Sequence, residues 1–184
     1  SYYLRYLVAF NNKLVGIIPS TLAGLHYLSL IDLHNNELTG SIPEFSSYNL
    51  YELYLQSNQL SGTIPLSLGN LYKIQRLNLS SNRLTGALPY IYPYNLYAMD
   101  LSDNGLEGSL KAVQNMNWMS VLNVSHNYFT GELPNVQWMY YLREFDVSHN
   151  KLIGTIPYSV GKLYYLERFL ASENHLSGPL PSSE

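Results

Sequence analysis

One asparagine recurs through the whole chain at a nearly constant spacing. Its eight copies stand 22 to 24 residues apart, at Asn12, Asn36, Asn58, Asn82, Asn104, Asn127, Asn150 and Asn174. The residues around each copy follow one pattern, which residues 77–89 show as L-x-L-x-x-N-x-L-x-G-x-L-P. A fixed period of this size is typical of a solenoid, in which each unit packs only against its neighbours. We therefore expect the 184 residues to form a single repeat array over 1–184.

The pattern predicts the local structure of each unit. The L-x-L segment alternates with period two and indicates a short strand whose copies pair in parallel, about 4.8 Å apart. The asparagine amide is expected to satisfy backbone groups of the turn, and the glycine suits a left-handed turn. On the opposite side, the motifs L-A-G-L (22–25), L-G-N-L (68–71) and V-G-K-L (160–163) predict short helical turns. Lys111 stands where the other units carry proline.

Composition excludes two classes of protein. Charged residues make up 12% of the chain, the net charge is −3, and the few lysines and arginines are scattered, so no nucleic-acid surface is expected. No apolar run approaches the roughly 20 residues that span a bilayer, and no secretory leader is recognised. Attachment to a membrane is expected only through segments outside this sequence.

The full motif, L-x-x-L-x-L-x-x-N-x-L-x-G-x-I-P with L-G-x-L, resembles the plant-specific class of leucine-rich repeats. The match is best in residues 33–43, 55–65 and 147–157. The resemblance implies an α/β repeat solenoid, a curved right-handed superhelix of about eight repeats. Its parallel sheet would be concave and its convex segments short helices or irregular. Secreted members usually close their ends with cysteine-bearing caps. Because cysteine is absent here, we interpret the sequence as the uncapped middle of a longer protein, or as an engineered array.

The residues between the strand leucines are expected to form a binding surface on the concave side. Counted back from each asparagine, three aligned columns hold polar residues together with aromatic ones. Aromatic and arginine side chains supply most of the energy of protein interfaces, so this surface suits a protein or peptide partner. The alternative is that many of these residues are solvated spacers. The predicted binding residues are Tyr6, Phe10, Asp32, His34, Glu52, Tyr54, Arg76, Asp100 and Asp146.

Tyrosine fills six of the eight positions that lie ten residues before each asparagine. Stacked repeats would place these rings in a ladder along one rim, and tyrosine offers an apolar body with a polar tip. One hypothesis is a rim that binds sugar or protein. The alternatives are packing that shields the leucine core, and a sequence engineered or uncertainly assigned at these positions. The predicted rim residues are Tyr48, Tyr72, Tyr94, Tyr140 and Tyr164.

Two N-x-S sequons begin at Asn78 and Asn123. In a secreted chain they could carry glycans, which would cover the middle of the concave surface because both fall on strands. The alternative is that the letters merely satisfy the repeat pattern.

Catalytic and metal sites are weakly indicated. Asp103, His126, His149 and Glu173 share the column before the asparagine, and histidine with carboxylate can bind a divalent metal. Open, solvated columns rarely hold a metal in a fixed geometry, so no metal or cofactor is expected.

A second catalytic arrangement, Ser148 with His126 and Asp146, lacks the oxyanion hole and the pocket that acyl transfer needs. The pairs Arg143–Glu167 and Glu144–Arg168 are expected to be exposed salt bridges. We do not expect an enzyme.

The resemblance implies an extracellular recognition module of a plant receptor-like kinase or receptor-like protein, at the cell surface or in the cell wall. Its partners would be a protein or peptide ligand, and a co-receptor or cell-wall polysaccharide. Two alternatives stay open: a secreted wall protein of the polygalacturonase-inhibitor type, and a structural or engineered array that self-associates through its tyrosines.

Overall fold

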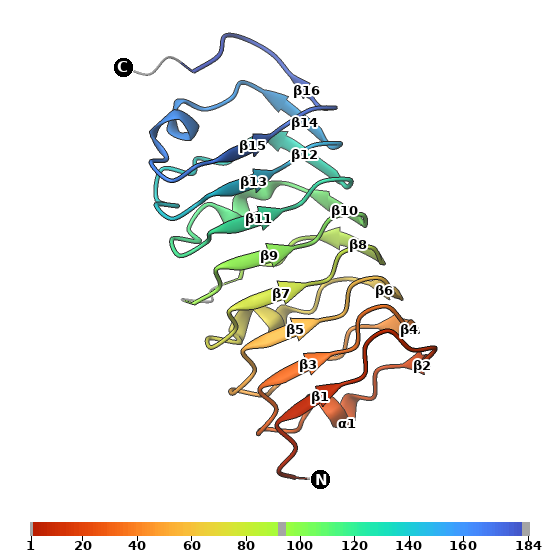
Figure 1. Cartoon of the computed structure of the whole chain (residues 1–184). Coiled ribbons are helices and arrows are strands. Elements are labelled where there is room, and N and C mark those ends of the chain that lie inside the picture. Colours follow the sequence, from red (N-terminus) through yellow and green to blue (C-terminus); the bar gives the residue numbers. More distant parts are fainter. Residues whose placement is uncertain (1, 92–94, 182–184) are drawn as a thin grey trace.

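The computed structural model describes residues 2–91 and 95–181, which form a stack of eight repeats with two parallel sheets (Figure 1). Odd-numbered strands make the first sheet, along one side of the stack. Its strands are β1 (Tyr6–Val8), β3 (Leu30–Asp32), β5 (Glu52–Tyr54), β7 (Arg76–Asn78), β9 (Ala98–Asp100), β11 (Val121–Asn123), β13 (Glu144–Asp146) and β15 (Arg168–Leu170). The leucine-rich-repeat solenoid predicted from the sequence is confirmed.

The first sheet has the predicted alternation. The central residue of each strand from β3 to β13 is buried, and the residues on both sides of it face outward. Strands pair in strict register, so that Glu52 lies beside Arg76, Arg76 beside Ala98, and Ala98 beside Val121. The columns inferred from the asparagine spacing are therefore real rows of neighbouring side chains.

A second parallel sheet, which the repeat pattern does not predict, runs along another side of the stack. Its strands are β2 (Val15–Ile17), β4 (Glu37–Ser41), β6 (Gln59–Gly62), β8 (Arg83–Ala87), β10 (Gly105–Gly108), β12 (Tyr128–Glu132), β14 (Lys151–Gly154) and β16 (His175–Leu176). They arise from the L-x-G segment, whose glycines all adopt φ between 77° and 88°. These φ values confirm the predicted left-handed glycine turn. Glycine suits the position because any other side chain would be strained there.

Short helices occupy the third side of the stack. They are α1 (Ser20–Ala23), η1 (Leu66–Asn70), η2 (Leu110–Val113) and η3 (Tyr158–Lys162). Three of them, α1, η1 and η3, overlap the predicted helical turns. An extended proline precedes each of these three. In repeat five Ser109 takes that place, and Lys111 lies inside η2. None of the helices in the described part of the chain is long and apolar enough to cross a membrane.

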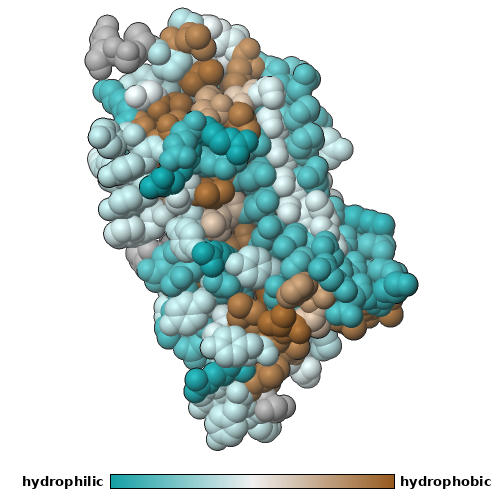
Figure 2. All heavy atoms as spheres, in the orientation of Figure 1, coloured by the Kyte–Doolittle hydropathy of each residue, from teal (hydrophilic) through white to brown (hydrophobic). Residues whose placement is uncertain are grey.

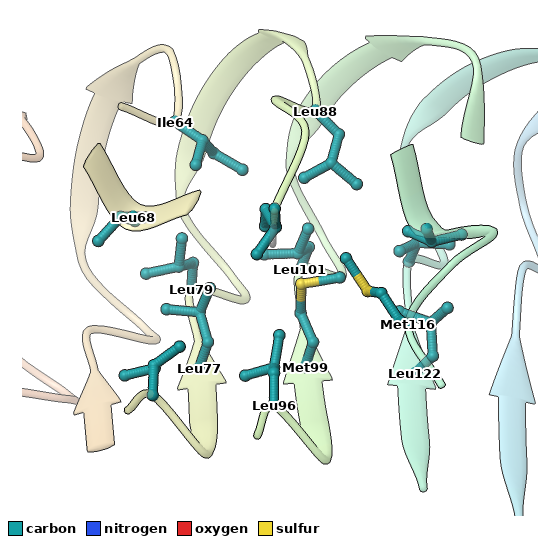
Figure 3. Close-up of a cluster of buried hydrophobic side chains, with 14 of the residues drawn as sticks. Ile64, Leu68, Leu77, Leu79, Leu88, Leu96, Met99, Leu101, Met116 and Leu122 are labelled. Carbon is teal, nitrogen blue, oxygen red and sulfur yellow. The ribbon is translucent and has the colours of Figure 1, made fainter. Parts of the chain in front are cut away.

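The core is a continuous apolar stripe between the two sheets and the helices. Figure 3 shows Leu77 and Leu79 with Ile64, Leu68 and Leu101, which converge from consecutive repeats. Each repeat therefore completes its core with side chains of its neighbours.

The anchor asparagines join successive repeats through hydrogen bonds. Asn127 donates from Nδ2 to the carbonyl oxygens of Val124 and Ser125 and to that of Leu101 in the preceding repeat. Its Oδ1 accepts a hydrogen bond from the backbone N–H of Leu106 at 2.9 Å. The amide thus satisfies turn groups as predicted, and it also binds one repeat to the next.

The residue before each anchor has a left-handed backbone without being glycine, with φ between 51° and 56°. Asparagine, aspartate and histidine are enriched in this region of φ, and most of these positions hold such residues. They are Asn11, Asn35, Ser57, Ser81, Asp103, His126, His149 and Glu173.

Candidate binding face

The outward side chains of the first sheet form a continuous surface, here called the first-sheet face. Figure 2 shows apolar patches on it, interrupted by hydrophilic groups. Seven of the nine predicted binding residues lie on the strands, and Phe10 and His34 stand two residues after the ends of β1 and β3. All nine are at least partly exposed. The structure therefore gathers them on one face, as the alternation predicted.

Arg76 occupies the centre of the charged part of this face. Its Nη1 donates to Oε1 of Glu52 at 2.9 Å, and its guanidinium lies 5.0 Å from the ring centre of Tyr97. A cation over an aromatic ring is attracted by the electrons of the ring face. The Arg76 side chain is nevertheless 46% exposed, so the guanidinium is held in place and still reachable. Tyr97, which precedes β9, was not selected from the sequence.

A shallow cavity of about 230 Å³ opens beside Arg76. Its lining residues are Tyr54, Arg76, Leu77, Asn78, Ala98, Met99, Asp100 and Val121. The small side chains of Ala98 and Val121 leave room between the charged pairs Glu52–Arg76 and Glu144–Arg168. This volume is below the roughly 300 Å³ at which small-molecule pockets begin.

Tyr54 lies at the edge of this cavity. Burial and the nearby Glu52 carboxylate raise the pKa of its phenol above the ordinary 10.0, although Arg76 acts in the opposite direction. The phenol therefore stays neutral and can both donate and accept a hydrogen bond at neutral pH.

A row of carboxylates and amides crosses the face, and each binds the residue two positions later. Oδ1 of Asp100 accepts a hydrogen bond from Ser102 Oγ at 2.7 Å, and Asp146 accepts one from Ser148 at 2.6 Å. Asp32 lies 2.5 Å from Nδ1 of His34. These contacts fix the orientation of the carboxylates, and within the described residues they use only Oδ1 of each.

Both sequon asparagines belong to the same row. Oδ1 of Asn78 accepts from Ser80 Oγ at 2.7 Å, and Asn123 does the same with Ser125. Because Asn78 also lines the cavity, a glycan attached there would stand at its margin.

The described rim tyrosines are exposed, and two of them, Tyr48 and Tyr72, stack on each other across adjacent repeats. Tyr48 lies between His26 and Tyr72, with ring centres 6.5 and 6.0 Å away. Tyr140 and Tyr164 instead meet Trp138 and Tyr165 edge-on. Tyr94 lies outside the described residues.

A second row of rings, one position further along the chain, runs through Trp118, Tyr141 and Tyr165. In Figure 2 pale rings stack along one lateral edge of the face. Stacking covers the ring faces and leaves their edges and hydroxyl groups open.

The geometry gives little support to the metal site and the catalytic arrangement considered from the sequence. His126 and His149 stack with ring centres 4.1 Å apart, but residues 2–91 and 95–181 contain no group of three or more potential metal ligands. Ser148 Oγ binds Asp146. The predicted salt bridges Arg143–Glu167 and Arg168–Glu144 are confirmed at 2.8 and 3.1 Å.

The Leucine Rich Repeat family model matches residues 3–25, 27–48, 49–71, 73–93 and 141–163, more than half of the chain. The chain belongs to this family. Receptor-like protein 7 of Arabidopsis thaliana is 48% identical to it over 40 residues, 22% of this chain and 4% of that protein. The resemblance to plant leucine-rich-repeat proteins is thus confirmed.

Two solved structures show how widely this fold is used. The Arabidopsis receptor kinase HAESA, in complex with the peptide hormone IDA and the co-receptor SERK1, matches 98% of this chain with a TM-score of 0.93 and 34% identity. A plant ice-binding protein matches 98% with a TM-score of 0.88 and 30% identity. The chain spans 31% of the first of these two chains and 60% of the second. The fold alone therefore does not decide the ligand.

Proposed function

We propose that the chain is a recognition module of an extracellular plant receptor-like protein or receptor kinase, which binds a protein or peptide ligand across the first-sheet face. The Arg76 site carries this proposal. A positioned, reachable guanidinium with Tyr54 and Tyr97 beside it has the composition of an interface hot spot. HAESA, a receptor for a peptide, supports this reading by its similarity. The module acts by binding and carries out no reaction.

In this proposal an extended segment of the ligand crosses the strands and inserts one side chain into the cavity over Ala98 and Val121. Polar groups of the ligand meet Arg76 and the carboxylates of Asp100 and Asp146. The tyrosine rim at Tyr48, Tyr72, Tyr140 and Tyr164 offers a second contact surface, suited to a co-receptor or a wall polysaccharide.

Selection of random displayed peptides against the purified chain tests this proposal. We expect the selected peptides to lose about tenfold or more in affinity for the Arg76→Ala variant, and similarly for Ala98→Leu, which fills the cavity. Arg83→Ala is the matched control, because Arg83 lies on the second sheet. Equal affinity for all three variants would rule out the first-sheet face as the binding surface.

The two alternatives make different predictions. An inhibitor of wall enzymes would use the same face to block a partner enzyme, and its target would fail to bind Arg76→Ala. A self-associating array would show an apparent molecular mass that rises with protein concentration, and this rise would disappear in Tyr48→Ser/Tyr72→Ser.

A glycan at Asn78 would weaken peptide binding, and Asn78→Gln would restore it.

A further inference from the structure

Among the described residues, three pairs of tyrosines from neighbouring repeats lie ring against ring on the surface. The ring centres of Tyr48 and Tyr72 are 6.0 Å apart, those of Tyr141 and Tyr165 are 6.4 Å apart, and those of Tyr3 and Tyr27 are 5.3 Å apart. The members of every pair are separated by 24 residues, which is one repeat. All six side chains are between 46% and 77% exposed.

The repeat geometry explains why these pairs form. Strands β1 and β3, β5 and β7, and β13 and β15 pair in register, and neighbouring parallel strands lie about 4.8 Å apart. Residues at equal distances before paired strands therefore emerge side by side. The backbone holds the two phenols in contact at an effective concentration that no dilution of the protein can lower.

The orientation of the rings also matters. Tyr141 and Tyr165 are nearly parallel, with an interplanar angle of 13°, and Tyr48 and Tyr72 are inclined by 22°. Stacking covers the inner ring faces, whereas the ring edges carry the hydroxyl group and the ring carbons next to it. These are the atoms that react when a phenol is oxidised by one electron.

We propose that these three pairs are sites of oxidative cross-linking, at which a haem peroxidase with hydrogen peroxide joins the two rings as dityrosine. Each phenol loses one electron and one proton, which gives two tyrosyl radicals. The radicals form a carbon–carbon bond between the positions beside the hydroxyl groups, and each joined carbon then passes its hydrogen to the phenol oxygen. The pair has lost two hydrogen atoms, and hydrogen peroxide accepts them to become two water molecules.

The bond would join consecutive repeats covalently along one edge of the solenoid. In a repeat array each unit is held only by its neighbours, so a staple between two units opposes their separation. This modification is independent of the ligand that the first-sheet face takes, because none of the six tyrosines lines the cavity beside Arg76.

The test treats the dilute, purified chain with peroxidase and hydrogen peroxide, then follows dityrosine fluorescence and maps cross-linked peptides by mass spectrometry. N-acetyltyrosine under the same conditions is the positive control for oxidation. The test variant is Tyr27→Phe/Tyr72→Phe/Tyr165→Phe, since phenylalanine keeps the ring stack and the fold. The matched control is Tyr128→Phe/Tyr158→Phe. Those tyrosines are 53% and 57% exposed, and in the described part of the chain their rings face Lys151 and Lys162.

We expect monomeric protein with cross-links between the paired tyrosines. The yield should fall about threefold or more in the test variant and stay unchanged in the control variant. Cross-links that include Tyr128 or Tyr158 as often as the paired tyrosines would overturn the proposal, and so would cross-links found only between molecules. A chain that forms no dityrosine under conditions in which N-acetyltyrosine reacts would overturn it as well. Mapping on the unsubstituted chain gives this answer even if a variant fails to fold.

Discussion

At the scale of single residues, the anchor asparagine is the most constrained position of the repeat. Asn36, Asn58, Asn127 and Asn150 are buried, and their amides bind backbone groups of their own turn and of the preceding repeat. A buried amide is tolerated only when its hydrogen bonds are satisfied, and here the partners are backbone groups that would themselves lack a partner. This mutual dependence explains why the asparagine recurs in all eight repeats.

The variant Asn127→Ala is expected to lower the free energy of unfolding by about 2 to 4 kcal/mol, because several buried backbone groups lose their partner at once. Asn12→Ala is the matched control. Asn12 is exposed, and within the described residues its side-chain amide donates only to the carbonyls of Ala9 and Phe10, so its loss should cost about 1 kcal/mol or less. Urea unfolding measures both values. Equal losses at the two positions would contradict a role for burial between repeats.

The phenol of Tyr54 should titrate above pH 10.0, because burial and the Glu52 carboxylate raise its pKa. A folded pKa above the unfolded one gives stability that is fully present below the unfolded pKa and lost as pH rises through the folded one. The carbon-13 NMR shift of the Tyr54 phenol carbon follows the titration. Glu52→Gln should lower this pKa, and Glu132→Gln, on the second sheet, should leave it unchanged. An unchanged pKa in Glu52→Gln would remove the carboxylate as a cause.

Residue spacing predicted much of the candidate site. The columns placed Arg76, Glu52 and Asp100 on one face, because side chains alternate between the two faces of a strand and the repeat keeps the strands in register. Tyr97 could not be found in this way. It belongs to the segment before β9, and its contact with Arg76 depends on side-chain direction in three dimensions.

At the scale of elements, the sequence predicts the first sheet but not the second. The first sheet follows from the alternation of leucines. The second is formed by short strands that contain glycine, and glycine is depleted in strands. Its strands pair with those of neighbouring repeats, as Thr39 pairs with Gln59, so the sequence of a single repeat does not predict them.

Two glycines occupy equivalent positions in the helices η1 and η3 and should respond differently to the same change. A Cβ atom on Gly69 would lie 2.5 Å from the carbonyl oxygen of Tyr90, whereas one on Gly161 would meet nothing within 4 Å. Gly69→Ala should therefore destabilise the fold by about 1 to 3 kcal/mol. Gly161→Ala should be neutral or stabilising by up to about 1 kcal/mol, because it restricts the unfolded chain.

Thermal or urea unfolding of the two variants measures this difference. It also tests whether η1 packs as closely on Tyr90 of the next repeat as the structure shows. Equal stability of Gly69→Ala and Gly161→Ala would contradict that close approach.

At the scale of the whole molecule, stability must be distributed along the stack rather than concentrated in one core. Each strand of the first sheet pairs only with the strands before and after it. Repeats in the middle therefore have two neighbours, and the terminal repeats of this chain have one. Burial follows the same course. The central residues of β9 and β11 are almost fully buried, whereas those of β1 and β15 are only partly buried.

Hydrogen exchange should therefore be graded along the chain. In a repeat array the terminal units can open without the others, so amides of β1 and β15 are expected to exchange on the order of tenfold or more faster than those of β9 and β11. Exchange followed by mass spectrometry resolves these segments. Uniform protection would mean that the stack opens only as a whole, and the asparagine bonds between repeats would then have to be strong enough to couple all eight units.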